Sequence, residues 1–284
     1  MQNKVIITCA LTGVLAKKEQ CAAIPYSPIE IAEEALRAYE AGATVVHIHA
    51  RTPDGGPSWE SSVFGDIKKE IQKRCPVILN FSSGGIGLPI QERTKHIVDH
   101  RPDIAALNMG SMNYAIYSRK NKKFHHDFVF KNPFGDIQYC LEQISLAGSL
   151  PELECFDCGH VANAEPFIDM GVLKTPAHFS LILGVLGGIS TRPGNLAAMA
   201  ANVPQGSHWE VIGIGRDQWR LLKEALELGG DIRVGLEDNF YLPNGEMASS
   251  NGDLVSVAVD LVKEMGQLIA TLAEARQVLK LAPR

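Results

Sequence analysis

The sequence contains no long apolar run. No stretch approaches the roughly 18 consecutive apolar residues that identify a membrane-spanning helix. Residues 1–4 lead directly into a short apolar segment, without the regions that make up a signal peptide. We therefore expect no membrane partner and a cytoplasmic location.

Cysteine and net charge are also sparse. The six cysteines are scattered, and only Cys155 and Cys158 lie close together, where we expect the end of a strand rather than the start of a helix. Without a second pair they do not suggest a zinc or redox motif, so we expect reduced, structural thiols. From the net charge of −5 we expect no nucleic-acid partner.

Short apolar segments alternate with amphipathic ones along the 284 residues, of which 45% are hydrophobic and 21% charged. The segments that read as strands are 5–11, 44–49, 77–81, 104–107, 153–157, 178–183, 209–213 and 232–235. Helical periodicity covers residues 28–41, 62–73, 90–100, 134–147, 164–170, 194–201, 217–228 and 254–279. This pattern predicts an α/β fold, a single (β/α)8 TIM barrel over residues 1–284, which the helix 254–279 closes.

Start and stop signals support the helices. Ser27 and Glu30 form a capping-box pattern around Pro28, which fits the first helical position. Gly42 and Gly229 stand where the first and seventh helices should end.

The predicted second strand carries His47 and His49. Side chains alternate along a strand, so both imidazoles point to the same face, where a shared cation would satisfy two otherwise buried polar groups. In a barrel, functional groups gather at the carboxyl ends of the strands. Glu237 and Asp238 follow the eighth strand, which lies beside the first, so Glu237 can complete a two-His, one-carboxylate metal site while Asp238 stays free as a base.

Two further loops at this end suit anions. Gly213, Gly215 and Arg216 follow the seventh strand, where barrels often bind phosphate through backbone amides, although a tight turn explains the glycines equally well. The residues from Ser82 to Gly85 follow the third strand and could hold a carboxylate through hydroxyls and amides, or simply form a turn. The fourth and fifth strands lead to Asn108, Ser111, Glu154 and His160.

Taken together, six blocks resemble the β-keto acid cleavage enzymes. They are ITCALTG at 7–13, AGATVVHIHAR at 41–51, GSMN at 110–113, PELE at 151–154, GIGR at 213–216 and RVGLED at 233–238. The resemblance implies a zinc-dependent barrel that converts a β-keto acid and acetyl-CoA into acetoacetate and a new acyl-CoA. It implies His47, His49 and Glu237 as zinc ligands, with Asp238 as base and Arg233 as its partner. It also implies that Ser83 and Asn108 lie near the substrate carboxylate, with Glu154 as a polar contact. From their positions after the third and fourth strands we expect Gly85 and Ser111 near the substrate as well.

The chain departs from the family's type member at one place. Where that enzyme has a glutamate for the ammonium group of 3-keto-5-aminohexanoate, Val14 and Leu15 follow Gly13 here. An apolar pair cannot compensate a buried cation, so we expect an uncharged aliphatic β-keto acid as substrate.

Other interpretations remain open. Amidohydrolase barrels also use an H-x-H strand, and His160, His178 and Asp238 could serve as their further ligands. A metabolite-binding barrel without catalysis is a third interpretation. The ligand set suits zinc, but manganese, cobalt or iron would also bind. We expect a homo-oligomer, possibly a tetramer.

Overall fold

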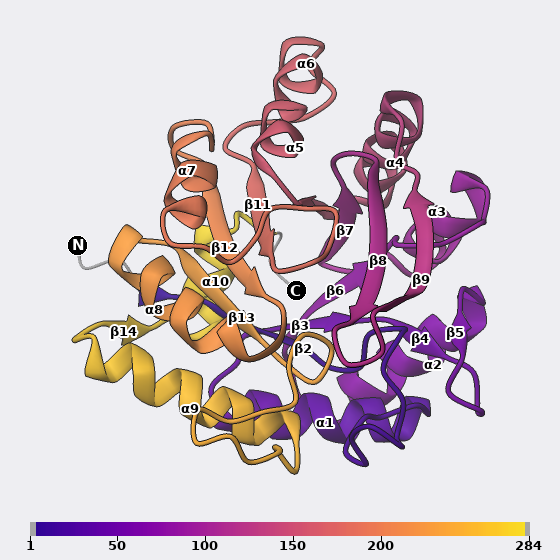
Figure 1. Ribbon diagram of the computed structural model, residues 1–284. Coiled ribbons are helices and arrows are strands. Elements are labelled where there is room, and N and C mark those ends of the chain that lie inside the picture. The colour runs from indigo at the N-terminus through magenta and orange to yellow at the C-terminus, as the bar shows by residue number, and fades with distance from the viewer. Residues whose placement is uncertain (1–3, 282–284) are drawn as a thin grey trace.

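The computed structural model describes residues 4–281, and its centre is a closed parallel barrel (Figure 1). In order around the barrel its eight strands are β10 (Leu150–Cys155), β11 (His178–Leu183), β12 (His208–Gly213), β13 (Asp231–Val234), β2 (Ile7–Ala10), β3 (Val45–Ile48), β6 (Ile78–Ser82) and β7 (Ile104–Asn108). Helices cover them on the outside, so the strands are buried on both faces and read as apolar runs. The predicted (β/α)8 fold and its eight strands are confirmed.

The outer helices follow the predicted segments closely. They are α1 (Pro28–Ala41), α2 (Ser61–Gln72), α3 (Ile90–His100), α4 (Phe134–Ala147), α5 (Cys158–Ala162), α6 (Ala164–Asp169), α7 (Asn195–Ala201), α8 (Gln218–Leu228) and α9 (Asn251–Glu264). The capping box at the start of α1 is present, with the Ser27 side chain accepting from the Glu30 amide. Gly42 and Gly229 cap α1 and α8.

The predicted closing helix 254–279 is wrong as one helix. The helix α9 ends at Glu264, and Gly266 turns the chain with a φ of +69°. The short strand β14 (Leu268–Ile269) then pairs with β1 (Lys4–Val5). A second capping box, Thr271 with Glu274, starts α10 (Leu272–Val278). Periodicity alone did not reveal this interruption.

Residues of the C-terminal segment nevertheless close one end of the barrel. Ala270, Ala275 and Leu279 form an apolar cluster with the first residues of three strands, Val45, Ile78 and Ile104. This apolar layer seals the amino-terminal end of the barrel, so only the opposite end is open for chemistry.

Two local features were not predicted from the sequence. Cys155 ends β10, but Cys158 opens α5, because the Asp157 carboxylate accepts from the His160 amide as an N-cap. All six cysteines are free, as expected. The segment after β7, which carried no prediction, forms an antiparallel hairpin of β8 (Met112–Ser118) and β9 (Lys123–Phe130).

Within residues 4–281, no helix is both long and apolar enough to cross a membrane.

Candidate metal centre and active site

His47 and His49 lie at the carboxyl end of β3. His47 is fully buried and points into the barrel, in register with Ala10 of β2 and Asn80 of β6. His49 follows the strand and is partly exposed. Because His47 and His49 are two positions apart in an extended segment, both rings lie on the same side of the chain. Their ring centroids are 5.2 Å apart.

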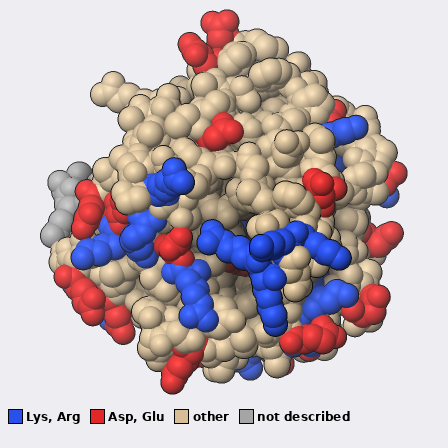
Figure 2. Space-filling model, viewed as in Figure 1, with Lys and Arg blue, Asp and Glu red and all other residues tan. Residues whose placement is uncertain are grey.

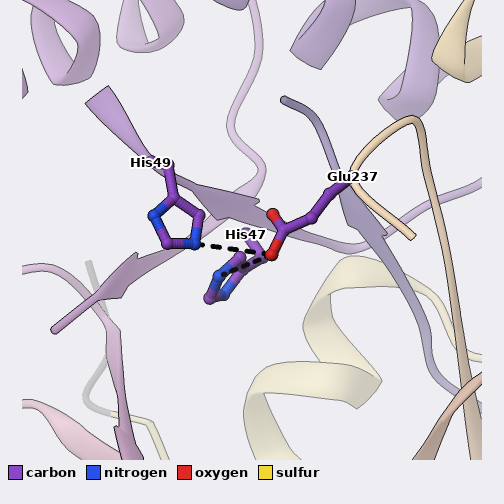
Figure 3. A group of neighbouring side chains, drawn as sticks. All are labelled: His47, His49 and Glu237. Atoms are coloured by element: carbon purple, nitrogen blue, oxygen red, sulfur yellow. Dashed lines mark ion pairs between the residues drawn. The ribbon is translucent and has the colours of Figure 1, made fainter. Parts of the chain in front are cut away.

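Glu237 reaches these histidines from the loop after β13 (Figure 3). Its Oε1 lies 3.4 Å from Nε2 of His49 and 3.9 Å from Nε2 of His47. One ligand atom from each of the three side chains lies within 4.8 Å of the others. The structure therefore brings together the three residues that were predicted as metal ligands.

The polar atoms of this group fit a bound cation. Nε2 and Nδ1 of His47 and Oε2 of Glu237 are buried without any hydrogen-bond partner, which is costly unless another partner is supplied. Burial, with the nearby Arg233 guanidinium, lowers the pKa of His47 to about 3, so its imidazole is neutral, as a metal ligand must be. Burial raises the pKa of Glu237, but His49, Arg233 and His47 outweigh this, and the pKa lies well below its usual value.

The backbone that presents Glu237 is tightly held. Gly235 has a φ of +143°, and a Cβ there would lie 2.1 Å from the carbonyl oxygen of Ala10, so only glycine fits. The amide of Leu236 donates to Oδ1 of Asn251 at 3.0 Å, and that of Glu237 donates to Ala10 at 3.2 Å. The Glu237 side chain therefore emerges from a fixed position, as a preformed site requires.

Asp238 forms a bidentate pair with Arg233. Nε and Nη2 of the guanidinium donate to the two carboxylate oxygens at 2.9 and 3.0 Å, and both side chains are 2% exposed. Nη2 also lies 3.1 Å from Oε1 of Glu237. Burial raises the pKa of Asp238, Arg233 opposes the change, and the result is about 6. Asp238 is thus an ionised base at neutral pH whose proton affinity suits general catalysis.

Glu154 lies next to the same guanidinium, with its Oε1 3.9 Å from Nη1 of Arg233. Burial, followed by the charge of Glu152, raises the pKa of Glu154 to about 8. Its carboxyl group is therefore mostly protonated at pH 7 and can donate a hydrogen bond.

Ser82, the last residue of β6, and Ser83, which follows it, point in different directions. The Ser83 hydroxyl donates to the carbonyl of Ala106 at 2.6 Å and lies next to Cys140 of α4, outside the barrel. Ser82 instead points inward, since its Oγ and the Asn108 amide both lie near Gly84. Of the two serines in the predicted Ser82–Gly85 run, Ser82 therefore accompanies Asn108 at the mouth, and the alternation along β6 could have indicated which one.

Two other predicted contacts serve the local backbone. A Cβ on Gly85 would lie 2.9 Å from Cγ of Arg93, so this glycine permits close packing. The Ser111 hydroxyl accepts from the Asn132 amide at 2.7 Å and ties the base of the β8–β9 hairpin.

The glycine loop after β12 supports the active site. The amide of Gly215 donates to the carbonyl of Asp238 at 2.8 Å, and the amide of Ile214 donates to Leu183 at 3.0 Å. A Cβ on Gly213 would lie 2.7 Å from Cα of Gln218. The amides of Ile214 and Gly215 therefore already donate hydrogen bonds within the protein. The Arg216 side chain is exposed, with its Cζ 4.0 Å from the centroid of the Tyr241 ring, and remains available to an anion.

A second cluster, Glu152, His178 and Glu210, lies deeper in the barrel and also satisfies metal-ligand spacing. Its carboxylate oxygens, however, are already hydrogen-bonded: Thr8 donates to Glu210 at 2.6 Å, Asn80 donates to Glu152, and Ser180 contacts both carboxyl groups.

This second cluster is better suited to a proton than to a metal. The single hydrogen of the Ser180 hydroxyl serves only one carboxyl group, so the other must be protonated and donate to Ser180. Burial, with the charge of Glu152, raises the pKa of Glu210 well above its usual value, which identifies Glu210 as the protonated partner.

Three residues near the metal centre were given no role from the sequence. Arg51 is buried and donates to the carbonyls of Thr12, Gly13, Ala16 and Gly55, which fixes the loop after β2. Gly13 packs against the Glu237 side chain. Burial, together with the negative charges of Glu237 and Asp238, raises the pKa of the Tyr114 phenol in β8. Its place directly after the strand that carries the two histidines was the signal available for Arg51 in the sequence.

Comparisons with known proteins agree with this geometry. A family model described as beta-keto acid cleavage enzyme matches residues 4–281. The chain is 39% identical to a 3-keto-5-aminohexanoate cleavage enzyme of Fusobacterium nucleatum over 99% of both chains. It is 35% identical to the 3,5-dioxohexanoate:acetyl-CoA acetone transferase of Paraburkholderia graminis, over 99% of this chain and 96% of that one. The fold resembles the apo structure of ObcA, with a TM-score of 0.75 and 23% identity over 92% of this chain and 66% of that one.

We predict that His47→Ala, His49→Ala and Glu237→Ala each abolish tight binding of a divalent metal, because each removes one of three protein ligands. Elemental analysis of the purified variants and zinc titration measure this. His178→Ala serves as the control and should retain the metal. If His178→Ala loses it and His47→Ala does not, the deeper cluster is the metal site.

We predict that Glu210→Gln changes the pH dependence of stability. A raised pKa in the folded state stabilises the fold below the unfolded-state pKa, and this contribution is lost as pH rises through the folded pKa. Glutamine cannot titrate. The free energy of unfolding of Glu210→Gln, minus that of the wild type, should therefore increase with pH above about 4.5, by up to about 1.4 kcal/mol per pH unit.

Urea unfolding of both proteins at several pH values between about 5 and 8 measures this difference. The exposed Glu227→Gln is the matched control and should show a flat difference. A flat difference for Glu210→Gln as well would mean that Glu210 is ionised in the fold.

Proposed function

This chain belongs to the β-keto acid cleavage enzyme family and is a β-keto acid:acetyl-CoA acyltransferase. We propose that its substrate is an uncharged aliphatic β-keto acid. We further propose that this substrate binds at a zinc ion held by His47, His49 and Glu237. The observation that carries the proposal is the juxtaposition of this unsatisfied triad with the Arg233–Asp238 pair. The ligand set, two imidazoles and one carboxylate, leaves positions open for a chelating substrate.

A bound divalent cation would supply Lewis acidity toward the ketone and carboxylate oxygens of the substrate, which makes its C2 proton more acidic. Asp238 would accept this proton. Arg233 orients the Asp238 carboxylate through two hydrogen bonds, and its Nη1 is buried without a partner, which suits it to an oxygen that gains negative charge. The protonated Glu154 could donate to the same region.

The reaction forms one carbon–carbon bond in a first step and breaks another in a second step. C2 of the substrate attacks the carbonyl carbon of acetyl-CoA, and the CoA thiolate leaves. The thiolate then attacks the original ketone carbon, the bond between that carbon and C2 breaks, and the proton held by Asp238 returns to C2. The products are acetoacetate and an acyl-CoA that carries the rest of the substrate.

The loop after β2 supports an apolar substrate pocket. Val14 and Leu15 are partly buried between Gly13, which contacts Glu237, and Ala16, whose carbonyl accepts from Arg51. Residues 13–16 include no acidic residue, so a substrate ammonium group beside Val14 and Leu15 would lack a counter-charge there.

The amidohydrolase alternative is not supported. His178 is the first residue of β11 and so lies deeper in the barrel than the triad, and Nδ1 of His160 accepts from the Phe156 amide at 3.3 Å. Membership of an enzyme family also argues against the third interpretation, a metabolite-binding barrel without catalytic activity.

Isotope labelling tests the proposed reaction. Zinc-loaded protein is incubated with acetyl-CoA labelled in both acetyl carbons and a panel of β-keto acids of different chain length. By the two steps above, both labels should appear in acetoacetate, as its C3 and C4, and none in the new acyl-CoA. Unlabelled acetoacetate, or turnover without acetyl-CoA, would refute the mechanism.

We predict that Asp238→Asn keeps its metal but loses turnover by roughly 10²-fold or more, as expected for a missing general base. Exchange of the substrate C2 protons into heavy water, followed by NMR, isolates this step. Metal content equal to that of the wild type is the control. Exchange at the wild-type rate would remove Asp238 from the role of base.

We predict that Leu15→Glu increases activity on 3-keto-5-aminohexanoate and decreases activity on aliphatic β-keto acids. A new carboxylate would pair with the ammonium group but would be desolvated beside an alkyl chain. The two kcat/KM values should move in opposite directions, each by roughly 10-fold or more.

Leu15→Gln is the matched control, since it is polar but uncharged and should not gain on the aminated compound. Should the wild type already have its highest kcat/KM on 3-keto-5-aminohexanoate, the apolar-pocket proposal is wrong.

A further inference from the structure

The turn of the β8–β9 hairpin is strongly basic in a chain that is acidic overall. Arg119, Lys120, Lys122 and Lys123 occupy four of five consecutive positions, whereas the whole chain has a net charge of −5. All four side chains are exposed, and no acidic group of residues 4–281 forms an ion pair with any of them. Such a concentration of unpaired like charge favours an anionic ligand.

The base of this hairpin lies at the open end of the barrel. Met112 is buried against Phe156, Ile182 and Ile212, and Ala115 forms a bridge with Leu186 in the loop after β11. The hairpin lies in front of the barrel strands in Figure 1, and Figure 2, in the same view, shows Lys and Arg side chains gathered across the middle of this face.

The hairpin thus links the metal centre to its basic turn. Near its base, Tyr114 packs against Phe156, Ile182 and Ile212, which lie at the carboxyl ends of β10, β11 and β12 around the mouth of the barrel. From Tyr114 the four remaining residues of β8 extend over roughly 13 Å toward the turn. A ligand held at the turn could therefore reach the metal centre only through a long arm.

Beside the basic turn lies an exposed aromatic pair. Tyr117 and Phe124 are opposite each other in the hairpin, with ring centroids 5.2 Å apart, and are 43% and 61% exposed. Exposed aromatic rings next to cations form a surface on which a nucleobase stacks while its phosphates pair with the charges.

We propose that the turn of the β8–β9 hairpin binds the nucleotide end of the CoA thioester, with the 3′-phosphate and diphosphate on Arg119, Lys120, Lys122 and Lys123 and the adenine on Tyr117 and Phe124. The proposal rests on the proposed function, which requires a CoA thioester at this mouth. The long, uncharged pantetheine arm would connect the two regions. The exposed aromatic pair beside the charges favours CoA over an acidic surface of a second copy, because a nucleobase can stack on these rings.

Direct binding tests the proposal. The variant Arg119→Gln/Lys120→Gln/Lys122→Gln/Lys123→Gln alters only exposed side chains, so the fold should be retained. Calorimetry with CoA and with adenosine 3′,5′-bisphosphate, at low and at high salt, should show roughly 10-fold or weaker affinity for the variant and a reduced salt dependence. Tyr117→Ser/Phe124→Ser should weaken both ligands without changing the salt dependence.

The matched control removes the same charge elsewhere. Lys69→Gln/Lys95→Gln/Lys174→Gln/Lys223→Gln also neutralises four exposed lysines, all outside the hairpin, and should bind CoA as the wild type does. Unchanged CoA affinity in the hairpin variants, or equal weakening in the control, would overturn the proposal. An altered sedimentation coefficient with unchanged CoA affinity would instead assign the hairpin to an interface between copies, and tighter binding of an RNA oligonucleotide than of CoA would assign it to nucleic acid.

Kinetics separate this inference from the proposed function. If the wild type turns over, the ratio of its kcat/KM for acetyl-CoA to that for acetyl-pantetheine, which lacks the nucleotide, should fall roughly 10-fold in the hairpin variant. An unchanged ratio would contradict the inference. If the wild type processes no β-keto acid, the proposed function fails, while the binding measurements still decide the role of the hairpin.

Discussion

The buried guanidinium of Arg233 organises the active end of this barrel. It holds Asp238 with two hydrogen bonds and lies 3.1 Å from Glu237, and Glu154 also lies within 4 Å of it. At pH 7 this guanidinium stands among three ionised carboxylates, those of the buried Asp238 and Glu152 and of the partly buried Glu237. Buried charge without compensation is costly, so a divalent cation beside Glu237 would balance the excess of negative charge.

Proton placement limits the charge in the rest of the barrel interior. Glu154 and Glu210 have raised pKa values and carry protons at neutral pH, whereas Glu152 remains ionised next to hydrogen-bond donors. The barrel therefore has an apolar layer at its closed end, a hydrogen-bonded layer of carboxyl and hydroxyl groups above it, and the charged site at its mouth. This order allows ionised groups near the mouth, where substrate and solvent can reach them.

The same contacts give the two acids after β13 different surroundings. Their backbone is held by Gly235, Asn251 and Gly215, and Asp238 is turned toward Arg233 while Glu237 faces the histidines. Adjacent residues of similar chemistry thereby acquire different proton affinities, the Asp238 pKa being about 6 and that of Glu237 well below its usual value. One is suited to a ligand and the other to a base.

The sequence by itself determined the strand–helix alternation, because strands buried on both faces must be apolar and the helices carry capping residues that act locally. It also determined that His47 and His49 share a face, since this follows from the alternation along one strand. Their convergence with Glu237 required one further rule, that strand ends meet at one mouth of a closed barrel.

Tertiary structure decided what local patterns do not encode. The break at Gly266 depends on β14 pairing with the distant β1. The direction of Ser83 depends on Ala106 and Cys140, and the use of the Gly215 amide depends on Asp238. The proton on Glu210 follows from Thr8, Ser180 and Glu152, which belong to three other strands. Each of these outcomes rests on groups that are remote in the chain, and burial and hydrogen bonding act on them only once the barrel has closed.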